Sequence, residues 1–287
     1  MAIWTLGIAD IHAGSNFALI PPHMARRPMK RGDALERWKG AEKKHPGHVD
    51  MQLAAVNQGI KESKKFWNQF ESMLMKLPKI DYAFIVSDNI EGKQHKSEGI
   101  GLLSSAIKDQ TFVASYILDH IYKYAKWKKC WGVRGTEYHV GEFDDEVYEG
   151  VPKIEGWEDK LFVEASGLVW RVQHHIGRSA TPYGKQTPLS KAMIQNTLMA
   201  ACEKEHDADV QLYGHVHYCV GSSFPMSRKR AFTLPCLKLQ GEAYGRRFND
   251  FYDVGLLLFK QEKEGAPLQE YPMKIRVAYD KPKLYKG

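Results

Sequence analysis

Short apolar runs alternate with longer segments of helical periodicity along the first half of the chain. Residues 3–9 and 82–86 are brief and almost wholly apolar, which is typical of strands buried on both faces. Between them, apolar side chains recur at helical spacing over residues 50–77. A second helix is predicted over 108–127, followed by a strand at 130–134. This order of strand, helix, strand, helix and strand predicts an α/β fold with a central, largely parallel sheet.

The second half of the chain is richer in strand-like runs. Two apolar runs surround Gly167 within residues 161–173, and residues 189–206 are predicted to be helical. The remaining predicted strands lie at 208–213 and near 231–240, 252–259 and 272–279. These strands predict a second sheet, more antiparallel than the first. We expect one domain over residues 1–287, because no linker rich in Gly, Ser or Pro separates two self-sufficient halves.

Residues 13–48 interrupt this pattern, because they have no clean period and contain four prolines and many charges. A loop of this length inside a compact domain is usually functional or disordered. Between residues 23 and 45 it carries eight basic and three acidic side chains, a net charge of +5. The basic residues are Arg26, Arg27, Lys30, Arg31, Arg37, Lys39, Lys43 and Lys44. We therefore describe residues 13–48 as a basic insertion.

Side chains able to bind a metal follow five of the predicted strands. They stand in Asp10-Ile11-His12, Asp88, Gly135-Thr136-Glu137-Tyr138-His139, His174-His175 and Gly214-His215-Val216-His217. In open α/β sheets, ligands bind just outside the carboxyl ends of strands. Each motif alone has a commoner explanation, such as a turn for Asp88 or an ordinary loop histidine for His139. The ordered set of five indicates a site, because coincidence would have to act five times.

Two of these motifs place a pair of ligands on one side of the chain. Because strand side chains alternate, Asp10 and His12 are expected to point the same way, and so are His215 and His217. Carboxylate and imidazole groups together suit divalent transition metals. The pattern therefore predicts a metal site with mixed oxygen and nitrogen ligands.

The ordered set resembles the motifs of the calcineurin-like metallophosphoesterase superfamily, over roughly residues 3–260. Those motifs are D-x-H, G-D-x-x-[DE]-G, G-N-H-[DE], a lone His and G-H-x-H. The resemblance implies an α/β fold in which a two-sheet sandwich is flanked by helices. It also implies two divalent metal ions, Mn²⁺, Fe or Zn²⁺, at the strand ends.

By this resemblance, six side chains bind the metal pair. Asp10, His12 and His217 bind the first ion, His174 and His215 bind the second, and Asp88 bridges both. His174 is preferred to His175 because the family's ligand comes directly off its strand. The ions, about 3.5–4 Å apart in such centres, lower the pKa of a bridging water to give the hydroxide that attacks phosphorus. His139 is then the general acid that protonates the leaving group.

Two positions depart from the family pattern. Ser87 replaces the glycine before the bridging aspartate, and Thr136 stands where the family has an asparagine ligand. A hydroxyl is a poorer metal ligand than an amide carbonyl, so Glu137 or water is left to complete the coordination of the second ion. His139 stands two residues further along than the family's histidine, and His95 is its competitor for the role of acid.

The charge balance favours an extended, anionic substrate. The chain has a net charge of +7, and we expect the basic insertion, Arg178, Lys185 and residues 228–230 (Arg-Lys-Arg) to lie on the side of the site. The predicted function is a phosphodiesterase or nuclease acting on DNA or RNA. A small-molecule phosphodiesterase or phosphomonoesterase is the alternative, and an inactive metal- or nucleic-acid-binding protein with a decayed site is a candidate of another class. A Ser/Thr protein phosphatase is disfavoured, because Glu91 is followed directly by glycine rather than by arginine.

The N-terminus and the cysteines bear on location. Residues 1–9 lack the basic and apolar regions of a signal peptide, and no stretch is apolar enough to cross a bilayer. The four cysteines form no C-x-x-C pair and fit reduced core thiols. We therefore expect a soluble, cytoplasmic protein without a membrane partner, whose oligomeric state the sequence leaves open.

Overall fold

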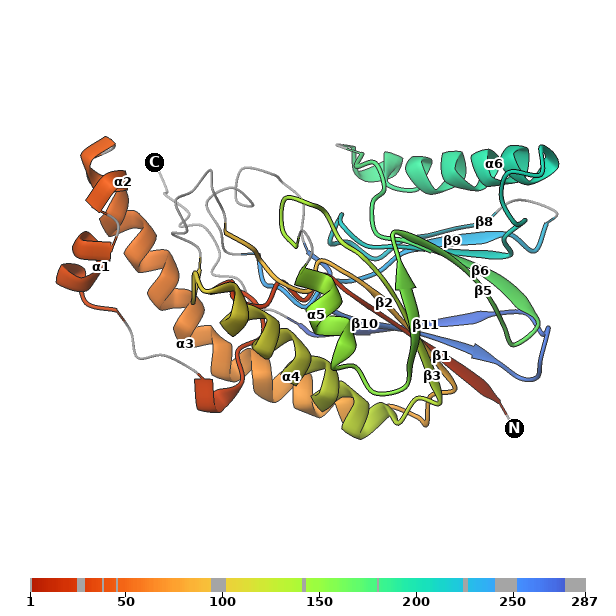
Figure 1. Ribbon diagram of the computed structural model, residues 1–287, viewed down its shortest axis with the longest axis horizontal. Coiled ribbons are helices and arrows are strands. Elements are labelled where there is room, and N and C mark those ends of the chain that lie inside the picture. Colours follow the sequence, from red (N-terminus) through yellow and green to blue (C-terminus); the bar gives the residue numbers. More distant parts are fainter. Residues whose placement is uncertain are drawn as a thin grey trace, which may run out of the picture.

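In the computed structural model, two β-sheets pack face to face and helices cover both outer faces (Figure 1). The described residues are 2–24, 29–37, 39–44, 46–93, 102–140, 143–179, 181–223, 227–240 and 252–276. The predicted fold class, an α/β two-sheet sandwich flanked by helices, is therefore confirmed.

The first sheet is six-stranded, in the order β11-β10-β1-β2-β3-β4. Its strands are β1 (Ile3–Ala9), β2 (Tyr82–Val86), β3 (Lys129–Val133), β4 (Ile154–Glu158), β10 (Gly255–Gln261) and β11 (Gln269–Lys274). Strands β1 to β4 run parallel, and β10 and β11 are antiparallel to their neighbours. The runs near 252–259 and 272–279 thus belong to the first sheet and not, as the sequence predicts, to the second, because β10 pairs with β1.

The second sheet is five-stranded, in the order β5-β6-β7-β9-β8. Its strands are β5 (Lys160–Ala165), β6 (Leu168–Gln173), β7 (Val210–Tyr213), β8 (Gly221–Ser223) and β9 (Arg230–Thr233). Strands β6, β7 and β9 run parallel, whereas the edge strands β5 and β8 are antiparallel to their neighbours. The second half of the chain is therefore richer in antiparallel pairs, as predicted.

Helices occupy three places around the sandwich (Figure 1). Those on the outer face of the first sheet are α3 (His48–Leu74), α4 (Ile107–Ala125) and α5 (Phe143–Glu149). The outer face of the second sheet is covered by α6 (Thr187–Ala201). The short helices α1 (Arg31–Arg37) and α2 (Lys39–Lys44) lie beside the N-terminal part of α3.

The basic insertion contains more structure than its sequence predicts. Ala34 of α1 is buried in a small cluster with Val56 and Ile60 of α3. Helices of six or seven residues show too few repeats of the 3.6-residue period to stand out from a charged background. Residues 13–21, which also have no clean period, are buried. Helix α1 and residues 13–21 are thus both packed against the rest of the fold.

Alternation along the strands divides the core into layers. On β2, Ala83 and Ile85 face the helices on the first sheet, whereas Phe84 and Val86 face the second sheet. All four are buried, and burying a side chain such as Phe84 stabilises the fold by roughly 1.5–3 kcal/mol. Leu189 of α6 packs in a separate cluster on the outer face of the second sheet. Packing on both faces holds the parallel strands in place, and the carboxyl ends of these strands carry the predicted motifs.

The described helices and cysteines bear on two further predictions. Within the described residues, no helix is both long enough and apolar enough to cross a membrane. Cys130 and Cys236 are buried as predicted. Cys219 is only partly buried, and Cys202, just past the last turn of α6, is exposed, so the prediction of core thiols is wrong for Cys202.

Candidate metal centre

The predicted motifs meet at the carboxyl ends of parallel strands. In the first sheet, β1 and β2 are in register at their last residues, so Asp10 and Asp88 leave neighbouring strand ends. In the second sheet, β6 and β7 are likewise in register, and the Gly214 N–H donates to the His174 carbonyl at 3.1 Å. The Asp10 carboxylate accepts the His215 N–H at 3.0 and 3.1 Å, which joins the two sheets. One edge of the sandwich therefore collects the predicted ligands.

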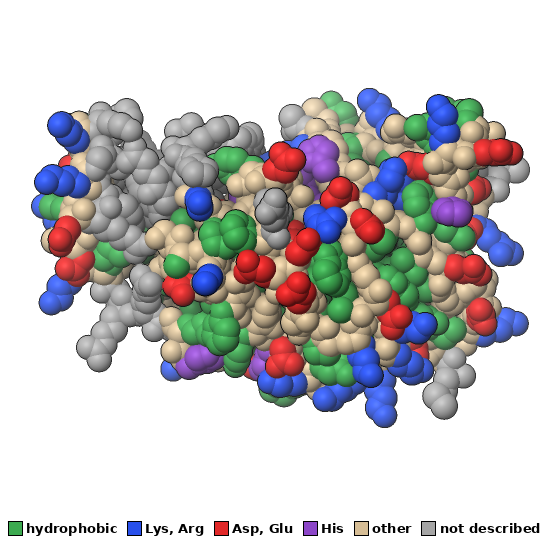
Figure 2. Space-filling model, in the orientation of Figure 1, with side chains coloured by type: hydrophobic (Ala, Val, Ile, Leu, Met, Phe, Trp, Pro, Cys, Tyr) green, Lys and Arg blue, Asp and Glu red, His purple; other side chains and the backbone are tan. Residues whose placement is uncertain are grey.

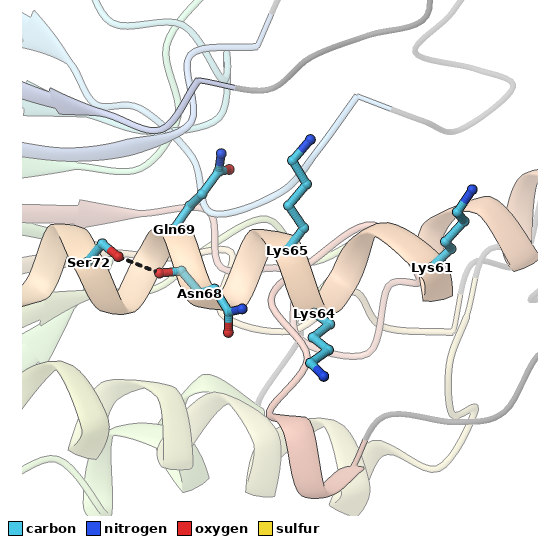
Figure 3. Close-up of a pocket in the computed structure, with 6 residues that line it drawn as sticks. All are labelled: Lys61, Lys64, Lys65, Asn68, Gln69 and Ser72. Carbon is cyan, nitrogen blue, oxygen red and sulfur yellow. Dashed lines mark hydrogen bonds between the residues drawn. The ribbon is translucent and has the colours of Figure 1, made fainter.

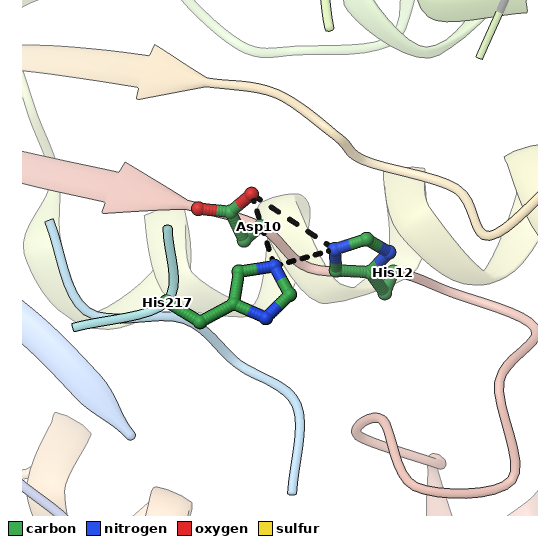
Figure 4. Close-up of side chains that lie close together, drawn as sticks. All are labelled: Asp10, His12 and His217. Atoms are coloured by element: carbon green, nitrogen blue, oxygen red, sulfur yellow. Dashed lines mark hydrogen bonds and ion pairs between the residues drawn. The ribbon is translucent and has the colours of Figure 1, made fainter. Parts of the chain in front are cut away.

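The first ligand group consists of Asp10, His12 and His217 (Figure 4). The Nε2 atoms of the two imidazoles lie 3.0 Å apart. Oδ1 of Asp10 lies 3.5 Å from Nε2 of His217 and 3.9 Å from Nε2 of His12. Figure 4 shows all three side chains pointing toward one another. One oxygen and two nitrogen atoms thus converge at a single place.

The second ligand group consists of Asp88, His174 and His215. Nε2 of His174 lies 3.5 Å from Oδ2 of Asp88. His174 is 2% exposed, and neither of its ring nitrogens makes a hydrogen bond within the described part of the chain. A buried polar group without a hydrogen bond costs about 1–3 kcal/mol, so His174 requires another partner. A divalent cation fits this requirement, because carboxylate and imidazole are both ligands for such ions.

A buried carboxylate stands behind the first group. Oε2 of Glu91 lies 2.8 Å from Nδ1 of His12 and 2.8 Å from Nζ of Lys238. A carboxylate at this distance favours a proton on Nδ1, which leaves the lone pair of Nε2 facing the site. Lys238, which is 4% exposed, balances the charge of Glu91, because an unpaired buried carboxylate would be costly. His12 is thus oriented by two residues outside the ligand set.

Four of the ligands occupy a backbone region that residues other than glycine rarely adopt. The φ angles are 51° at Asp10, 50° at His12, 70° at His215 and 58° at His217. Such conformations cost of order 1–3 kcal/mol each and cluster at functional sites. The convergence of each pair therefore comes from left-handed turns, and not from strand alternation as the sequence predicts.

Asp88 takes part in more than one ligand group and is held by the loop after β3. Thr136 donates to Oδ1 of Asp88 through its backbone N–H, at 2.7 Å, and through its hydroxyl, at 3.2 Å. Gly135 permits this approach, because a Cβ at that position would collide with Oδ1 of Asp88. Glu137 is exposed and belongs to none of the ligand groups found among the described residues. Thr136 therefore acts as a donor to Asp88.

Asp144, on α5, is hydrogen-bonded to both the loop after β2 and the loop after β3. Its carboxylate accepts hydrogen bonds from the Ser87 hydroxyl at 2.6 Å, the Asn89 amide at 3.0 Å and the Gly135 N–H at 2.8 Å. Burial raises the pKa of Asp144 to about 6, although these three donors oppose the shift. Asp144 thereby supports both segments that border Asp88.

His139 lies beside Asp88 and His12. Its Nε2 is 4.0 Å from Oδ2 of Asp88, and its ring meets that of His12 edge-on, with centroids 4.9 Å apart. Its Nδ1 lies 2.9 Å from the Glu91 carbonyl oxygen, which can only accept, so Nδ1 carries the proton of this bond. Nε2 is therefore the atom presented to the site. The side chain is 21% exposed, so solvent and substrate can reach it.

The imidazoles of the centre differ in how readily they take a proton. Burial lowers the pKa of His12 to about 4, and the charge of Lys238 adds to this effect. Burial likewise lowers the pKa of His215 to about 4. At His174, burial also disfavours the charged form, but the Asp88 carboxylate outweighs it and the pKa is raised. His12 and His215 thus keep free lone pairs at neutral pH, and positive charge is favoured beside Asp88.

The structure brings together all seven residues that the sequence places at the site. Asp10, His12, Asp88, His139, His174, His215 and His217 make up three overlapping ligand groups. His174 is buried, whereas His175 is exposed with its ring 4.5 Å from that of His215. His95, the competitor for the role of acid, lies outside the described residues.

The sequence does not predict three residues that support the candidate ligands: Glu91, Lys238 and Asp144. Glu91 has a recognisable signal, because it occupies the [DE] position of the D-x-x-[DE]-G motif. Lys238 and Asp144 have none, since each stands in a segment without a motif and is buried only by contacts with distant parts of the chain.

The basic cluster at residues 228–230 is not where the sequence predicts it. The cluster ends at Arg230, the first residue of β9, which runs parallel to β7. The ligands follow the opposite, carboxyl end of β7. Residues 228–230 therefore lie at the opposite end of the second sheet, because β8 carries the chain back after G-H-x-H. Two of the charges are paired there, Arg230 with Glu270 at 2.8 Å and Lys229 with Asp207.

The rest of the predicted basic surface is mixed in charge. On the face shown in Figure 2, acidic and basic side chains are interspersed, including over α1 and α2. Arg31 pairs with Asp50 at 2.7 Å. Arg178 is exposed in the loop after β6. Arg26 and Arg27 lie outside the described residues.

Beyond its motifs, the chain resembles known proteins only distantly. No family model and no curated protein matches it. Vps29 from Entamoeba histolytica, solved with zinc, matches at 12% identity and a TM-score of 0.40, covering 95% of this chain and 100% of that chain. An archaeal phosphodiesterase matches at 12% identity and a TM-score of 0.38, covering 94% and 99%. Vps29 from Cryptosporidium parvum matches at 12% identity and a TM-score of 0.42, covering 94% and 98%.

Proposed function

We propose that this chain, which has the two-sheet fold and the ordered strand-end motifs of the calcineurin-like metallophosphoesterase superfamily, hydrolyses phosphate esters with two divalent metal ions. The observation that carries the proposal is the convergence of the two ligand groups at one edge of the sandwich. The buried His174, without a hydrogen bond among the described residues, supports it. So does the left-handed backbone at four ligands.

In this role, Asp10, His12 and His217 would hold one ion, His174 and His215 would hold the other, and Asp88 would be available to both. When bound, the ions supply Lewis acidity, which lowers the pKa of water and offsets charge on the phosphoryl oxygens. Glu91 orients His12 through Nδ1. His139, with Nδ1 fixed on the Glu91 carbonyl, holds a proton at Nε2 and donates it to the leaving oxygen.

Removal of metal tests this function. Protein stripped with a chelator is expected to lose hydrolysis of a chromogenic phosphomonoester and of a chromogenic phosphodiester, and Mn²⁺ is expected to restore it. The ratio of the two rates distinguishes a phosphatase from a phosphodiesterase. Full activity in metal-free protein would refute the proposal. Bound metal with no activity on either ester would favour an inactive binding protein with a decayed site.

A nucleic-acid phosphodiesterase is the second candidate, and one surface favours it. The exposed face of α3 carries a shallow hollow lined by Lys61, Lys64, Lys65, Asn68, Gln69 and Ser72 (Figure 3). In Figure 3, Lys61 and Lys65 point to one side of the helix and Lys64 to the other. Three lysines and no acidic residue among these six suit a phosphate backbone, because each neutralised phosphate releases counterions.

A further inference from the structure

The two ligand groups are supported unequally. In the first, the Glu91 carboxylate lies 2.8 Å from Nδ1 of His12 and is itself paired with Lys238. In the second, Nε2 of His174 lies 3.5 Å from Oδ2 of Asp88, and its distal nitrogen, Nδ1, has no hydrogen-bond partner among the described residues. A partner on the distal nitrogen of a ligating imidazole fixes its orientation and raises its basicity, and losing that partner costs about 10–100-fold in metal affinity. On this ground alone the first group should bind a cation more tightly.

The supply of ligands is unequal as well. Asp88 and His12 share a ligand group, so the first subsite has a fourth ligand within reach in addition to its own three. The second subsite has Asp88, His174 and His215. The loop after β3 adds no fourth side chain to this group among the described residues. The Thr136 hydroxyl donates its proton to Asp88, Glu137 is exposed, and His139 groups with His12 and Asp88 rather than with His174 and His215.

We propose that the centre has one high-affinity and one low-affinity metal subsite. The Asp10-His12-His217 subsite fills first, and the Asp88-His174-His215 subsite fills only at a higher free metal concentration. This inference rests on the metal binding of the proposed function and not on its chemistry. The second ion is then exchangeable, so the fraction of protein with a complete centre follows the supply of divalent metal.

Calorimetric titration of the chelator-stripped protein with Mn²⁺ tests the inequality. For the wild type, we expect the first equivalent to bind at least about tenfold more tightly than the second. Electron paramagnetic resonance assigns the phases, because spin coupling between two Mn²⁺ ions should appear only as the second equivalent binds. Two equivalents of equal affinity would overturn the inequality and leave the proposed function intact. No binding at all would overturn both.

Substitution of Thr136 tests the cause of the weak subsite. Thr136→Asn provides an amide oxygen in place of the hydroxyl and is expected to tighten the second phase about tenfold while leaving the first unchanged. Thr136→Ser keeps the hydroxyl donor, serves as the matched control and should retain the wild-type ratio. An unchanged second phase in Thr136→Asn, with the first phase intact, would overturn the role of Thr136.

A second variant tests the strong subsite independently of Thr136. Glu91→Gln combined with Lys238→Met removes the buried charge pair as a unit, so neither charge is left unpaired. We expect the first phase to weaken by about 10–100-fold, which brings the two affinities together. A first phase as tight as in the wild type would show that support behind His12 does not cause the inequality.

Discussion

The hydroxyl of Ser87 donates a hydrogen bond of 2.6 Å to Oδ1 of Asp144, and both residues are fully buried. The same hydroxyl oxygen accepts the N–H of Asn89 at 2.6 Å, so it fixes the turn that carries Asp88. Ser87 is one of the two positions at which the chain departs from the calcineurin-like motifs that it resembles. Its hydroxyl therefore has a structural role that a glycine could not perform.

Ser87→Ala is expected to lower the free energy of unfolding by about 1–3 kcal/mol, because a buried hydrogen bond to a carboxyl group is lost. Denaturant unfolding of the metal-free protein measures the change. Ser72→Ala is the matched control, since Ser72 is exposed and donates at 2.8 Å to the Asn68 carbonyl of its own helix (Figure 3). We expect the control to change stability by less than about 0.5 kcal/mol. Equal losses in the two variants would contradict the role of Ser87.

Asp144 should make the stability of the metal-free protein depend on pH. Burial raises its pKa to about 6 from the usual 3.8, so the folded state binds this proton more tightly than the unfolded state. The resulting stability is fully present below about pH 4 and is lost as the pH rises through 6. A shift of this size corresponds to roughly 3 kcal/mol.

Asp144→Asn isolates this effect, because it removes the titrating group while the histidines titrate in both proteins and cancel. Between pH 4 and 7, the unfolding free energy of the variant should improve relative to that of the wild type by up to roughly 3 kcal/mol. The new amide would also face the donors from Ser87 and Gly135, at a cost that does not depend on pH. This cost shifts the variant's curve of unfolding free energy against pH by a constant and does not change its shape. Parallel curves across the whole range would mean that Asp144 does not titrate there.

His139→Ala should lower kcat by about 10²–10⁴-fold if His139 protonates the leaving group. The loss should shrink for esters with good leaving groups, because these depart without a proton. Metal content, measured on the same samples, should stay at the wild-type level. His175→Ala is the matched control, since His175 is exposed and adjoins the site. A loss independent of the leaving group would exclude His139 as the acid and direct attention to His95.

Asp88→Asn should reduce activity more than loss of any single ligand that belongs to one subsite. Asp88 shares ligand groups with His12 and with His174, so neutralising it weakens both subsites at once. Metal analysis after dialysis should show a loss at both. Asp119→Asn, at an exposed carboxylate paired with Lys123 at 2.8 Å, controls for the loss of charge. Normal metal content together with normal activity in Asp88→Asn would rule out its bridging role.

Replacing Lys61, Lys64 and Lys65 together by alanine tests the nucleic-acid candidate. If the hollow on α3 holds a DNA backbone, the slope of log Kd against log salt should flatten by about 2–3, because each phosphate contact contributes about 0.9. Hydrolysis of a small chromogenic diester should hardly change. Alanine at Lys191, Lys204 and Arg228, which are exposed around the second sheet, is the matched control. A slope unaffected in both variants would leave the small-molecule ester as the leading substrate.

The sequence predicts the strands and the convergence of the candidate ligands well, because both have strong local signals. The apolar runs of β1 and β2 are buried throughout most of their length, and Asp10 and Asp88 follow them directly or within two residues. The order of the motifs then indicates one edge of the sheets. None of this requires knowledge of contacts between distant residues.

The supporting residues could not be predicted, because their roles arise only in the folded chain. A lysine in an irregular segment is ordinarily exposed. Lys238 is buried because Glu91, 147 residues away in the sequence, supplies a partner for its charge. Asp144 stands on a seven-residue helix too short to show a helical period, and its three donors come from two other loops. The position of residues 228–230 depended on the short strand β8, which no pattern indicates.

The left-handed backbone at Asp10, His12, His215 and His217 decides which substitutions can be interpreted. Alanine at these positions keeps the conformational strain and loses the ligand, so a damaged variant could reflect either. Asparagine tolerates this region better than most residues, and glycine adopts it freely. In the metal-free state, His217→Gly should therefore be at least as stable as the wild type. When metal is supplied, the variant should bind less of it than the wild type. Each of these turns therefore carries a side chain that costs folding free energy and is placed to bind an ion.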